Sequence, residues 1–282
     1  MKKGSFDSAY FVNCSMSKIG LIGVGSLGRA LLDRINARNG NSNRKNLFYY
    51  HPDSLRSFSF DAQRAEDLND LFSRVDVVFL TIKPSSCQQL LDEIKKTKAY
   101  QDQRLPIFIS IMAGVPIKYL HQHLGISTPI FRMMLNITIM DDNFDDQVFV
   151  YCSDEAYRQT LKRICFYLGQ LIWVDDEDKL DVITAVYGCG PAFIASFYAN
   201  YLDIARRLGL PQRHLYRHIH HLFETTHALL VDHSPDDIIS RVSSKGGATQ
   251  RGLDQWKKGF PFLEEGLERS LERCQEIKRD LS

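Results

Sequence analysis

The sequence predicts an α/β N-terminal domain followed by an all-α C-terminal domain, and two observations support this fold class. From Lys18 to about residue 176, short apolar segments alternate with segments of helical periodicity, a pattern typical of a parallel sheet with helices on both faces. After residue 176 only helical patterns follow, and no further strand is expected. We therefore divide the chain into an N-terminal extension with little order (1–17), an α/β domain (18–175) and a helical domain (176–282).

The expected elements alternate along the first domain and become purely helical in the second. Strands are expected at 19–24, 46–51, 76–84, 106–114, 129–135, 147–153 and 171–176. Helices are expected from the turn after the first strand to Ile35, and at 65–75, 85–100, 116–125 and 154–169. The second domain is expected to contain helices at 177–187, 191–208, 212–231, 235–242, 247–256 and 260–279. A break at Gly188-Cys189-Gly190 should separate the first two of these, and Pro191 suits the start of the next helix.

The composition is that of an ordinary globular protein. Lys and Arg (35) nearly balance Asp and Glu (34), so neither a nucleic acid nor an anionic membrane surface is indicated as a partner. The apolar runs are too short to span a bilayer, and residues 1–17 lack the apolar core of a signal peptide. The six cysteines form no Cys-x-x-Cys pair, which favours reduced thiols, a cytoplasmic location and no zinc site.

A glycine-rich turn is the first candidate binding element. An apolar run leads into Gly23-Val-Gly25-Ser26-Leu27-Gly28, and apolar residues then recur at helical spacing. In a strand–turn–helix context Gly23 permits the sharp turn, Gly25 leaves room for a pyrophosphate, and Gly28 lets the helix pack against the strand. The amides near Ser26 and Leu27 would face the phosphate charge. The pattern predicts a Rossmann-type dinucleotide-binding domain, and a turn that binds nothing is the alternative.

Four further motifs follow the glycine turn in a fixed order. They are TIKP (81–84), SIMAG (110–114), EDKLDVITAVYGCGPAF (177–193) and SKGGAT (244–249). With these motifs the chain resembles the pyrroline-5-carboxylate reductase family from Lys18 to about Ile277. The resemblance implies a helical dimerisation domain, a homodimer, and NAD(P)H-dependent reduction of a cyclic imino acid. The substrate that the resemblance implies is 1-pyrroline-5-carboxylate, whose reduction gives proline in proline biosynthesis.

The resemblance also implies roles for individual residues. Thr249 matches the family's threonine that contacts the imine nitrogen, and it is the expected catalytic residue. A substrate carboxylate would be bound by the Ser244 hydroxyl and by the amides of Gly246, Gly247 and Ala248 at a helix start, with Cys189 also in contact with the substrate. The alternative for these two stretches is a plain helix start and a bend between helices. The cofactor is expected to contact Gly23, Gly25, Ser26, Leu27, Gly28, His51, Lys83, Pro84, Ala113 and Asn136.

The chain departs from the family pattern where substrate and nicotinamide should meet. Arg-x-Met-Pro-Asn-Thr-Pro of the family becomes Arg-Met-Met-Leu-Asn-Ile-Thr at 132–138, so both prolines and the threonine are replaced. Tyr187 and Cys189 stand where the family has two serines, and Lys245 replaces a proline. Two alternatives therefore remain: a reductase of a different imine, and a paralogue that binds nucleotide without turnover. Glu177, where the family also has a glutamate, is expected either to brace the domain interface or to be a solvated acid at a helix start.

The end of the second strand bears on the choice of cofactor. An acidic residue there would bind the adenosine ribose of NAD. Tyr50-His51-Pro52 stands at this place instead, with Asp53 and Arg56 beyond it. Arg56 would attract a phosphate, so NADPH is favoured and NADH stays possible.

Two other functions are less favoured, and self-association is expected. A hydroxyacid dehydrogenase of the related two-domain type would need a catalytic lysine, and none occurs in 183–205. The histidines from His214 to His227, with Glu224 among them, resemble metal ligands, but a helix surface or a subunit contact is the expected role. The helical half is rich in apolar residues, among them Phe193, Ile194, Phe197 and Tyr201. We expect part of this apolar surface to be buried against a second copy of the chain.

Overall fold

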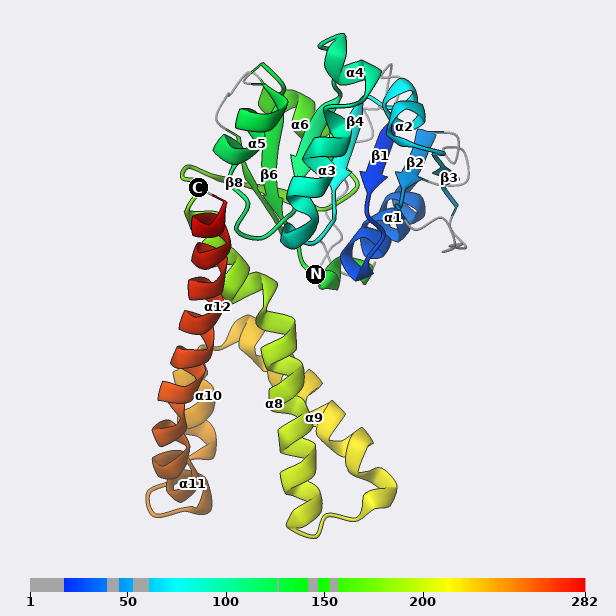
Figure 1. The fold of residues 1–282 in the computed structure, drawn as a ribbon. Helices are drawn as coiled ribbons and strands as arrows, with labels where there is room; N and C mark the ends of the chain where they lie inside the picture. The colour runs from blue at the N-terminus through cyan, green and yellow to red at the C-terminus, as the bar shows by residue number, and fades with distance from the viewer. Residues whose placement is uncertain are drawn as a thin grey trace. The chain divides into compact units, whose positions relative to one another are not determined.

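The computed structural model describes residues 18–39, 46–52, 61–125, 127–141, 147–152 and 157–281 (Figure 1). The expectations for residues 1–17, Asp53 and Arg56 lie outside these residues. The chain forms two compact units. The first reaches to Thr184 and includes the residues from Cys274 on, and the second is Ala185–Arg273.

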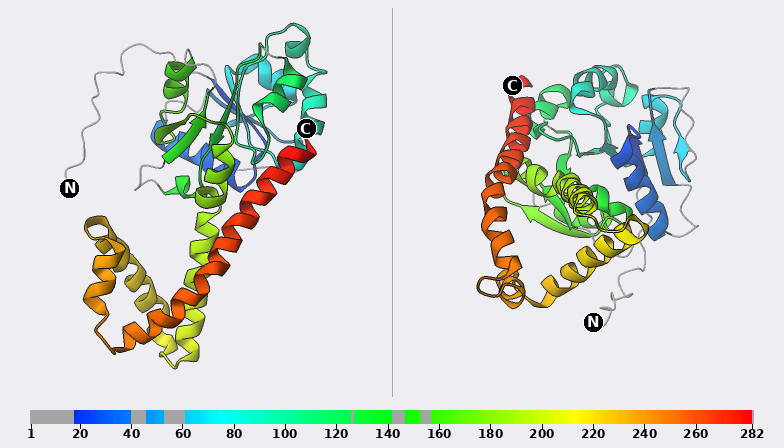
Figure 2. Two further views of the ribbon diagram at one scale, coloured as in Figure 1. Left: turned by 90° about the vertical axis from the view of Figure 1, so that its left-hand side faces the viewer. Right: turned by 90° about the horizontal axis from the view of Figure 1, so that it is seen from below.

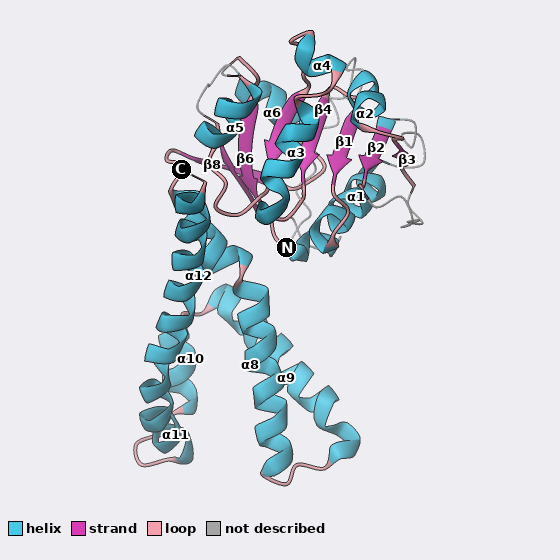
Figure 3. Cartoon of the chain, in the orientation of Figure 1, coloured by secondary structure: helices cyan, strands magenta, loops and turns pink. Residues whose placement is uncertain are grey.

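An eight-stranded sheet forms the centre of the first unit, with strand order β3-β2-β1-β4-β5-β6-β7-β8 (Figure 3). Its strands are β1 (Ile19–Ile22), β2 (Leu47–Tyr50), β3 (Gln63–Arg64), β4 (Val77–Leu80), β5 (Ile107–Ser110), β6 (Ile130–Met134), β7 (Gln147–Tyr151) and β8 (Gln170–Val174). Neighbouring strands are parallel except that β7 is antiparallel to β6. The predicted α/β class, with a mostly parallel sheet, is confirmed.

Two features of the sheet differ from the sequence prediction. β7 is antiparallel to β6 because the described residues of their link form only a short 3₁₀ helix, η4 (Ile137–Met140), whereas a parallel crossover usually needs an α-helix. β3 has no counterpart among the expected strands. It is two residues long and pairs Gln63 with Phe48 and Arg64 with Tyr49, so only a contact distant in sequence defines it.

The helices of the first unit lie at the expected positions, but the helix expected at 154–169 ends at Ile164 and not at Gly169, and the helix expected at 85–100 is interrupted. They are α1 (Ser26–Asn39), α2 (Leu68–Arg74), α3 (Cys87–Ile94), α4 (Lys98–Gln101), α5 (Ile117–Leu124), α6 (Arg158–Ile164) and α7 (Lys179–Ile183), with a 3₁₀ helix, η3, at Pro84–Ser86. The single helix expected at 85–100 is thus divided. Thr97 explains the division, because its hydroxyl donates to the Ile94 carbonyl (2.6 Å) and accepts from the Tyr100 amide (3.3 Å), which caps α4.

The sheet of the first unit is buried on both faces. On one face Leu21 and Phe79 pack in a cluster that includes residues of α1 and α6. On the other face Ile22 and Leu80 pack in a cluster that includes residues of α2, α3 and α5. Successive residues of a strand point to opposite faces. The continuously apolar β1 and β4 are therefore strands covered on both sides, as in other mostly parallel sheets.

The second unit is helical throughout (Figure 2). Its elements are a π-helical segment, η6 (Thr184–Gly188), then α8 (Gly190–Arg207), α9 (Gln212–Asp232), α10 (Pro235–Val242), α11 (Ala248–Trp256), a 3₁₀ helix η7 (Lys257–Gly259) and α12 (Phe260–Asp280), whose last residues belong to the first unit. The all-α expectation for this part of the chain is confirmed. The break expected at 188–190 is narrower than predicted: η6 ends at Gly188, Cys189 alone lies between the two helical segments, and α8 begins at Gly190.

Much of the apolar surface of the second unit is exposed. A buried cluster is formed by Ala205, Leu215 and Ile219, with aromatic and aliphatic side chains around it: Tyr198, Tyr201, Leu202 and Phe223. By contrast, side chains on several helices are open to solvent, among them Ile194, Leu222, Leu229, Leu230, Val231 and Phe262. The unit therefore has a small core and a large apolar surface.

One helical run qualifies as a membrane span by length and composition. Among the described residues this is Lys179–Arg207, which comprises α7, η6 and α8. The expectation that no apolar run is long enough is therefore wrong. A single run of this kind is weak evidence for a span, because an apolar helix in a protein domain has the same length and composition.

Candidate active site

The glycine turn lies at the point where the strand order of the sheet reverses. β1 has β2 on one side and β4 on the other, and the turn joins the carboxyl end of β1 to α1 (Figure 1). In open α/β sheets, ligands bind in the crevice at such a switch point, outside the carboxyl ends of the strands. The backbone amide of Gly23 donates to the Tyr50 carbonyl at 3.0 Å, which ties the turn to the end of β2.

The three glycines of the turn occupy different environments. Gly23 has φ +93°, a left-handed conformation that favours glycine, and a Cβ there would lie 2.7 Å from the Ile82 side chain. A Cβ at Gly28 would lie 2.6 Å from the Gly23 carbonyl oxygen. A Cβ at Gly25 would meet nothing within 4 Å. Open space at Gly25, beside the exposed Ser26 at the start of α1, fits a pyrophosphate group.

Thr81 supports this turn, and the sequence reasoning missed it. Its hydroxyl lies within hydrogen-bonding distance of the carbonyl oxygens of Ile22 (3.0 Å) and Gly23, and its amide donates to the Ile22 carbonyl at 3.0 Å. The side chain also lies 2.9 Å from the position that a Cβ at Gly28 would take. Thr81 is the first residue of the TIKP motif, so the sequence contained a signal for it. In the resemblance to the family, however, the residues of this motif that matter are Lys83 and Pro84.

The other residues predicted to contact the cofactor lie at the same edge of the sheet. Because β1, β2, β4, β5 and β6 are parallel, the residues that follow them emerge at one edge. These residues are His51 after β2, Lys83 and Pro84 after β4, Ala113 after β5 and Asn136 after β6. Lys83 is exposed, whereas Asn136 is buried and precedes η4. With Ser26, Leu27 and the three glycines, the structure brings together all ten predicted cofactor residues on one unit.

A buried ion-pair network lies behind this edge. Arg132 in β6 is 3% exposed, and its guanidinium pairs with Glu177 (Nη1–Oε1, 3.0 Å) and Asp181 (Nη2–Oδ1, 3.0 Å). Glu177 Oε1 also accepts a hydrogen bond from the Ile117 amide at the start of α5 (2.8 Å). Glu177 therefore braces the first unit and is not a solvated acid. Asp181, which the sequence reasoning did not single out, completes the network.

The SKGGAT segment forms a tight turn that opens α11 in the second unit. Gly246 has φ +74°, and the Gly247 amide donates to the Ser244 carbonyl at 2.9 Å. Ala248 is the first residue of α11, and the first amides of a helix have no partner within it. Ser244, Ala248 and Thr249 are exposed. The structure thus brings the five predicted substrate-binding and catalytic residues of this segment together, while Cys189 lies half-buried before α8.

Within the described residues the cysteines are reduced and form no disulfide: Cys87, Cys152, Cys165, Cys189 and Cys274. Burial raises the pKa of the Cys87 thiol to about 12 and raises the pKa of Cys165 as well. Both thiols are therefore protonated near neutral pH and are poor nucleophiles or ligands.

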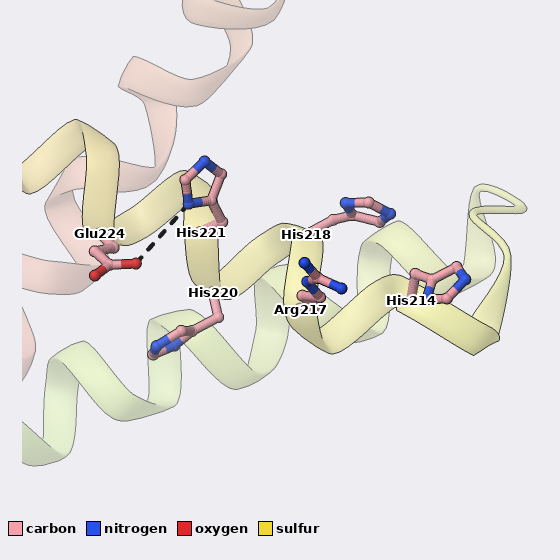
Figure 4. Close-up of a pocket in the computed structure, with 6 residues that line it drawn as sticks. All are labelled: His214, Arg217, His218, His220, His221 and Glu224. Carbon is pink, nitrogen blue, oxygen red and sulfur yellow. Dashed lines mark ion pairs between the residues drawn. The ribbon is translucent and has the colours of Figure 1, made fainter.

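The histidine-rich part of α9 lines a shallow pocket on the surface of the helix (Figure 4). Its lining residues are His214, Arg217, His218, His220, His221 and Glu224. His221 lies 3.9 Å from Glu224, and the His220 ring stacks on Tyr216 with the centroids 5.9 Å apart. Within the described residues no group of three His, Cys, Asp or Glu side chains has the arrangement of a metal site. These side chains form an exposed helix surface.

The chain is similar to known proteins over both units. Residues 177–280 match the domain family described as pyrroline-5-carboxylate reductase dimerisation, and residues 18–114 match the family described as NADP oxidoreductase, coenzyme F420-dependent. A pyrroline-5-carboxylate reductase of Staphylococcus epidermidis is 30% identical over 244 residues, which cover 84% of this chain and 88% of that protein.

Two solved structures share the fold. A pyrroline carboxylate reductase of Plasmodium falciparum with NADP bound has a TM-score of 0.79 at 21% identity, covering 93% of this chain and 98% of that one. A 1-pyrroline-5-carboxylate reductase of Streptococcus pyogenes has a TM-score of 0.79 at 21% identity, covering 93% and 99%.

Proposed function

Since the chain belongs to the pyrroline-5-carboxylate reductase family, we propose that it reduces 1-pyrroline-5-carboxylate to proline with NADPH. The observation that carries this proposal is the glycine turn at the switch point of the sheet. Its open space at Gly25 and its closely packed Gly28 fit a dinucleotide. The family relationship then indicates which bond the dinucleotide reduces.

The first unit would hold the cofactor at the carboxyl edge of its sheet. The amides at the start of α1, near Ser26 and Leu27, would bind the pyrophosphate. Lys83, Ala113 and Asn136 follow three successive strands at the edge where the rest of a dinucleotide extends. The reduced nicotinamide, when bound, supplies the hydride for the C=N bond.

The second unit would bind the imino acid through the SKGGAT turn. The amides of Gly246, Gly247 and Ala248 and the Ser244 hydroxyl are hydrogen-bond donors suited to a carboxylate. The Thr249 hydroxyl would donate a hydrogen bond to the nitrogen of the neutral imine, and its oxygen would accept one from the N–H of the protonated imine. Because an imine is basic enough to arrive partly protonated, positioning by this chain supplies much of the required catalysis without a strongly acidic group.

We also propose that the protein is a homodimer of the cytoplasm. Support for the dimer comes from the match of residues 177–280 to a dimerisation domain and from the exposed apolar side chains of the second unit. Support for the location comes from the reduced thiols, which are typical of a reducing compartment.

The test is an oxidation assay with NADPH and NADH over a panel of cyclic and acyclic imino acids. We expect the largest kcat/KM with NADPH and 1-pyrroline-5-carboxylate. A clear preference for another imine would indicate that Leu135, Tyr187 and Cys189, which differ from the family pattern, adapt the pocket to a different substrate. NADPH binding without consumption on any member of the panel would overturn the proposal and indicate a nucleotide-binding paralogue.

A further inference from the structure

Arg64 lies at the edge of the sheet where the glycine turn is found. It is the last residue of β3, which is parallel to β2 and pairs Arg64 with Tyr49. The Ala65 amide donates to the Tyr49 carbonyl at 2.8 Å, which continues this pairing beyond the strand. The carboxyl end of β3 therefore lies beside the carboxyl end of β2.

The guanidinium of Arg64 is directed to the residue that follows β2. Its Nη2 lies 3.5 Å from the His51 carbonyl oxygen. The Tyr50 carbonyl, one residue earlier, accepts the Gly23 amide of the glycine turn at 3.0 Å. Two hydrogen bonds thus connect Arg64, the end of β2 and the glycine turn.

The charged groups around the end of β2 differ in how they are held. Burial raises the pKa of the Tyr50 phenol, and so do the carboxylates of Glu93 and Asp67, whereas the Arg64 guanidinium acts in the opposite direction. Asp67 accepts the Asp70 amide at 2.7 Å, and Glu93 accepts the Gln89 side-chain amide at 3.1 Å. Both carboxylates are engaged with groups of α2 and α3, and the contacts of Arg64 include the backbone at the strand end.

The end of β2 is the place where dinucleotide domains distinguish their cofactors. An acidic residue there binds the ribose hydroxyls of NAD, and an arginine nearby accommodates the 2′-phosphate of NADP. Tyr50-His51-Pro52 contains no acidic residue. A guanidinium is planar and always charged, and it binds phosphate through two parallel hydrogen bonds.

We propose that Arg64 selects NADPH over NADH by pairing with the 2′-phosphate of the adenosine ribose. The inference rests on the proposed function, since it requires that a nicotinamide dinucleotide binds at the glycine turn. It names a residue on a strand that the sequence did not predict, in the role first given to Arg56.

The test measures binding of two adenosine fragments without nicotinamide and of the two complete dinucleotides. We would titrate the wild-type chain and Arg64→Gln with 2′,5′-ADP and with 5′-AMP by calorimetry, and both with NADP⁺ and NAD⁺. Glutamine keeps a donor for the His51 carbonyl but lacks the charge. We expect the Kd for 2′,5′-ADP and NADP⁺ to rise about 10- to 100-fold in Arg64→Gln, and the Kd for 5′-AMP and NAD⁺ to change little.

Two further variants control for structure and charge. Arg104→Ala removes the same charge just before the amino end of β5, at the opposite edge of the sheet, and should leave every Kd unchanged. Arg64→Lys should fall between wild type and Arg64→Gln, because lysine keeps the charge without the planar fork.

The two hypotheses fail in different ways. Equal losses for 2′,5′-ADP and 5′-AMP in Arg64→Gln, or no loss for either, would overturn the assignment of Arg64 while leaving the proposed function intact. A wild-type chain that binds neither dinucleotide would overturn the proposed function, and this inference with it.

Discussion

The two units of the molecule bury their apolar side chains to different degrees. In the first unit Leu21, Phe79 and Phe108 are fully inaccessible, in clusters on the two faces of the sheet. In the second unit Ile194 is 66% exposed and Phe262 is 78% exposed. Burial of apolar surface is the main force that favours the folded state. The first unit therefore buries its apolar core within one chain, whereas the exposed apolar side chains of the second unit are consistent with the homodimer proposed above.

Among the tests of this comparison, we expect the largest effect from Arg132→Met, which should lower the stability of the first unit. Removal of the guanidinium leaves the buried carboxylate of Asp181 and the partly buried carboxylate of Glu177 without their charge partner, which costs about 3–5 kcal/mol of unfolding free energy. Urea unfolding measures this loss. In a Trp256→Phe background the remaining tryptophan, Trp173 in β8, reports on the first unit alone.

The loss from Arg132→Met should be the same at all protein concentrations, because the network lies within one unit. Lys95→Met is the matched control. It removes a cation paired with Asp92 at 3.6 Å on the surface, and should cost no more than about 1 kcal/mol. Equal losses in the two variants would show that the buried network does not stabilise the first unit.

The next effect concerns the chemistry proposed for the second unit. Thr249→Ala removes the hydroxyl that would donate to the imine nitrogen, and we expect kcat to fall about 10²- to 10³-fold. Nucleotide binding, which we propose for the first unit, should not change. Steady-state kinetics and an NADP⁺ titration measure the two quantities separately.

Thr225→Ala is the control for Thr249→Ala. The Thr225 hydroxyl donates to the His221 carbonyl within α9 at 2.8 Å, so this variant loses a threonine hydroxyl of the same unit outside the SKGGAT turn. Its kcat should match wild type. If Thr249→Ala kept full turnover, the catalytic role of Thr249 would be refuted.

The smallest effect concerns the apolar surface itself. Leu229→Asp places a charge on an exposed leucine of the second unit, and we expect the dissociation constant of the dimer to rise about 10- to 100-fold. Sedimentation velocity over a range of concentrations measures this constant. Met140→Asp changes a residue of the first unit that is 60% exposed and should leave the dimer intact. A wild-type chain that is monomeric at all concentrations would contradict the comparison.

Local patterns were sufficient for most of the fold. The strands at 19–24 and 76–84 and the helices from 212 to 279 were predicted to within a few residues, because their apolar periodicity reflects the face that each element buries. The glycine turn was predictable because a side chain at Gly23 or Gly28 would clash with neighbouring atoms, so these positions require glycine.

Contacts distant in sequence decided the rest. β3 and the antiparallel β7 depend on strand pairing, which carries no local periodicity of its own. The family pattern at 132–138 includes Arg132 but predicts no partner for it, and its pairing with Asp181 joins residues that are 49 positions apart.

The sequence by itself therefore determined the order and type of the elements and the position of the glycine turn, because these depend on neighbouring residues. Only the tertiary structure decided which charged side chains meet, such as Arg64 with the end of β2 and Arg132 with Glu177 and Asp181. The physical reason is that these side chains become neighbours only when the whole sheet has formed. Their spacing along the chain does not predict which of them will be in contact.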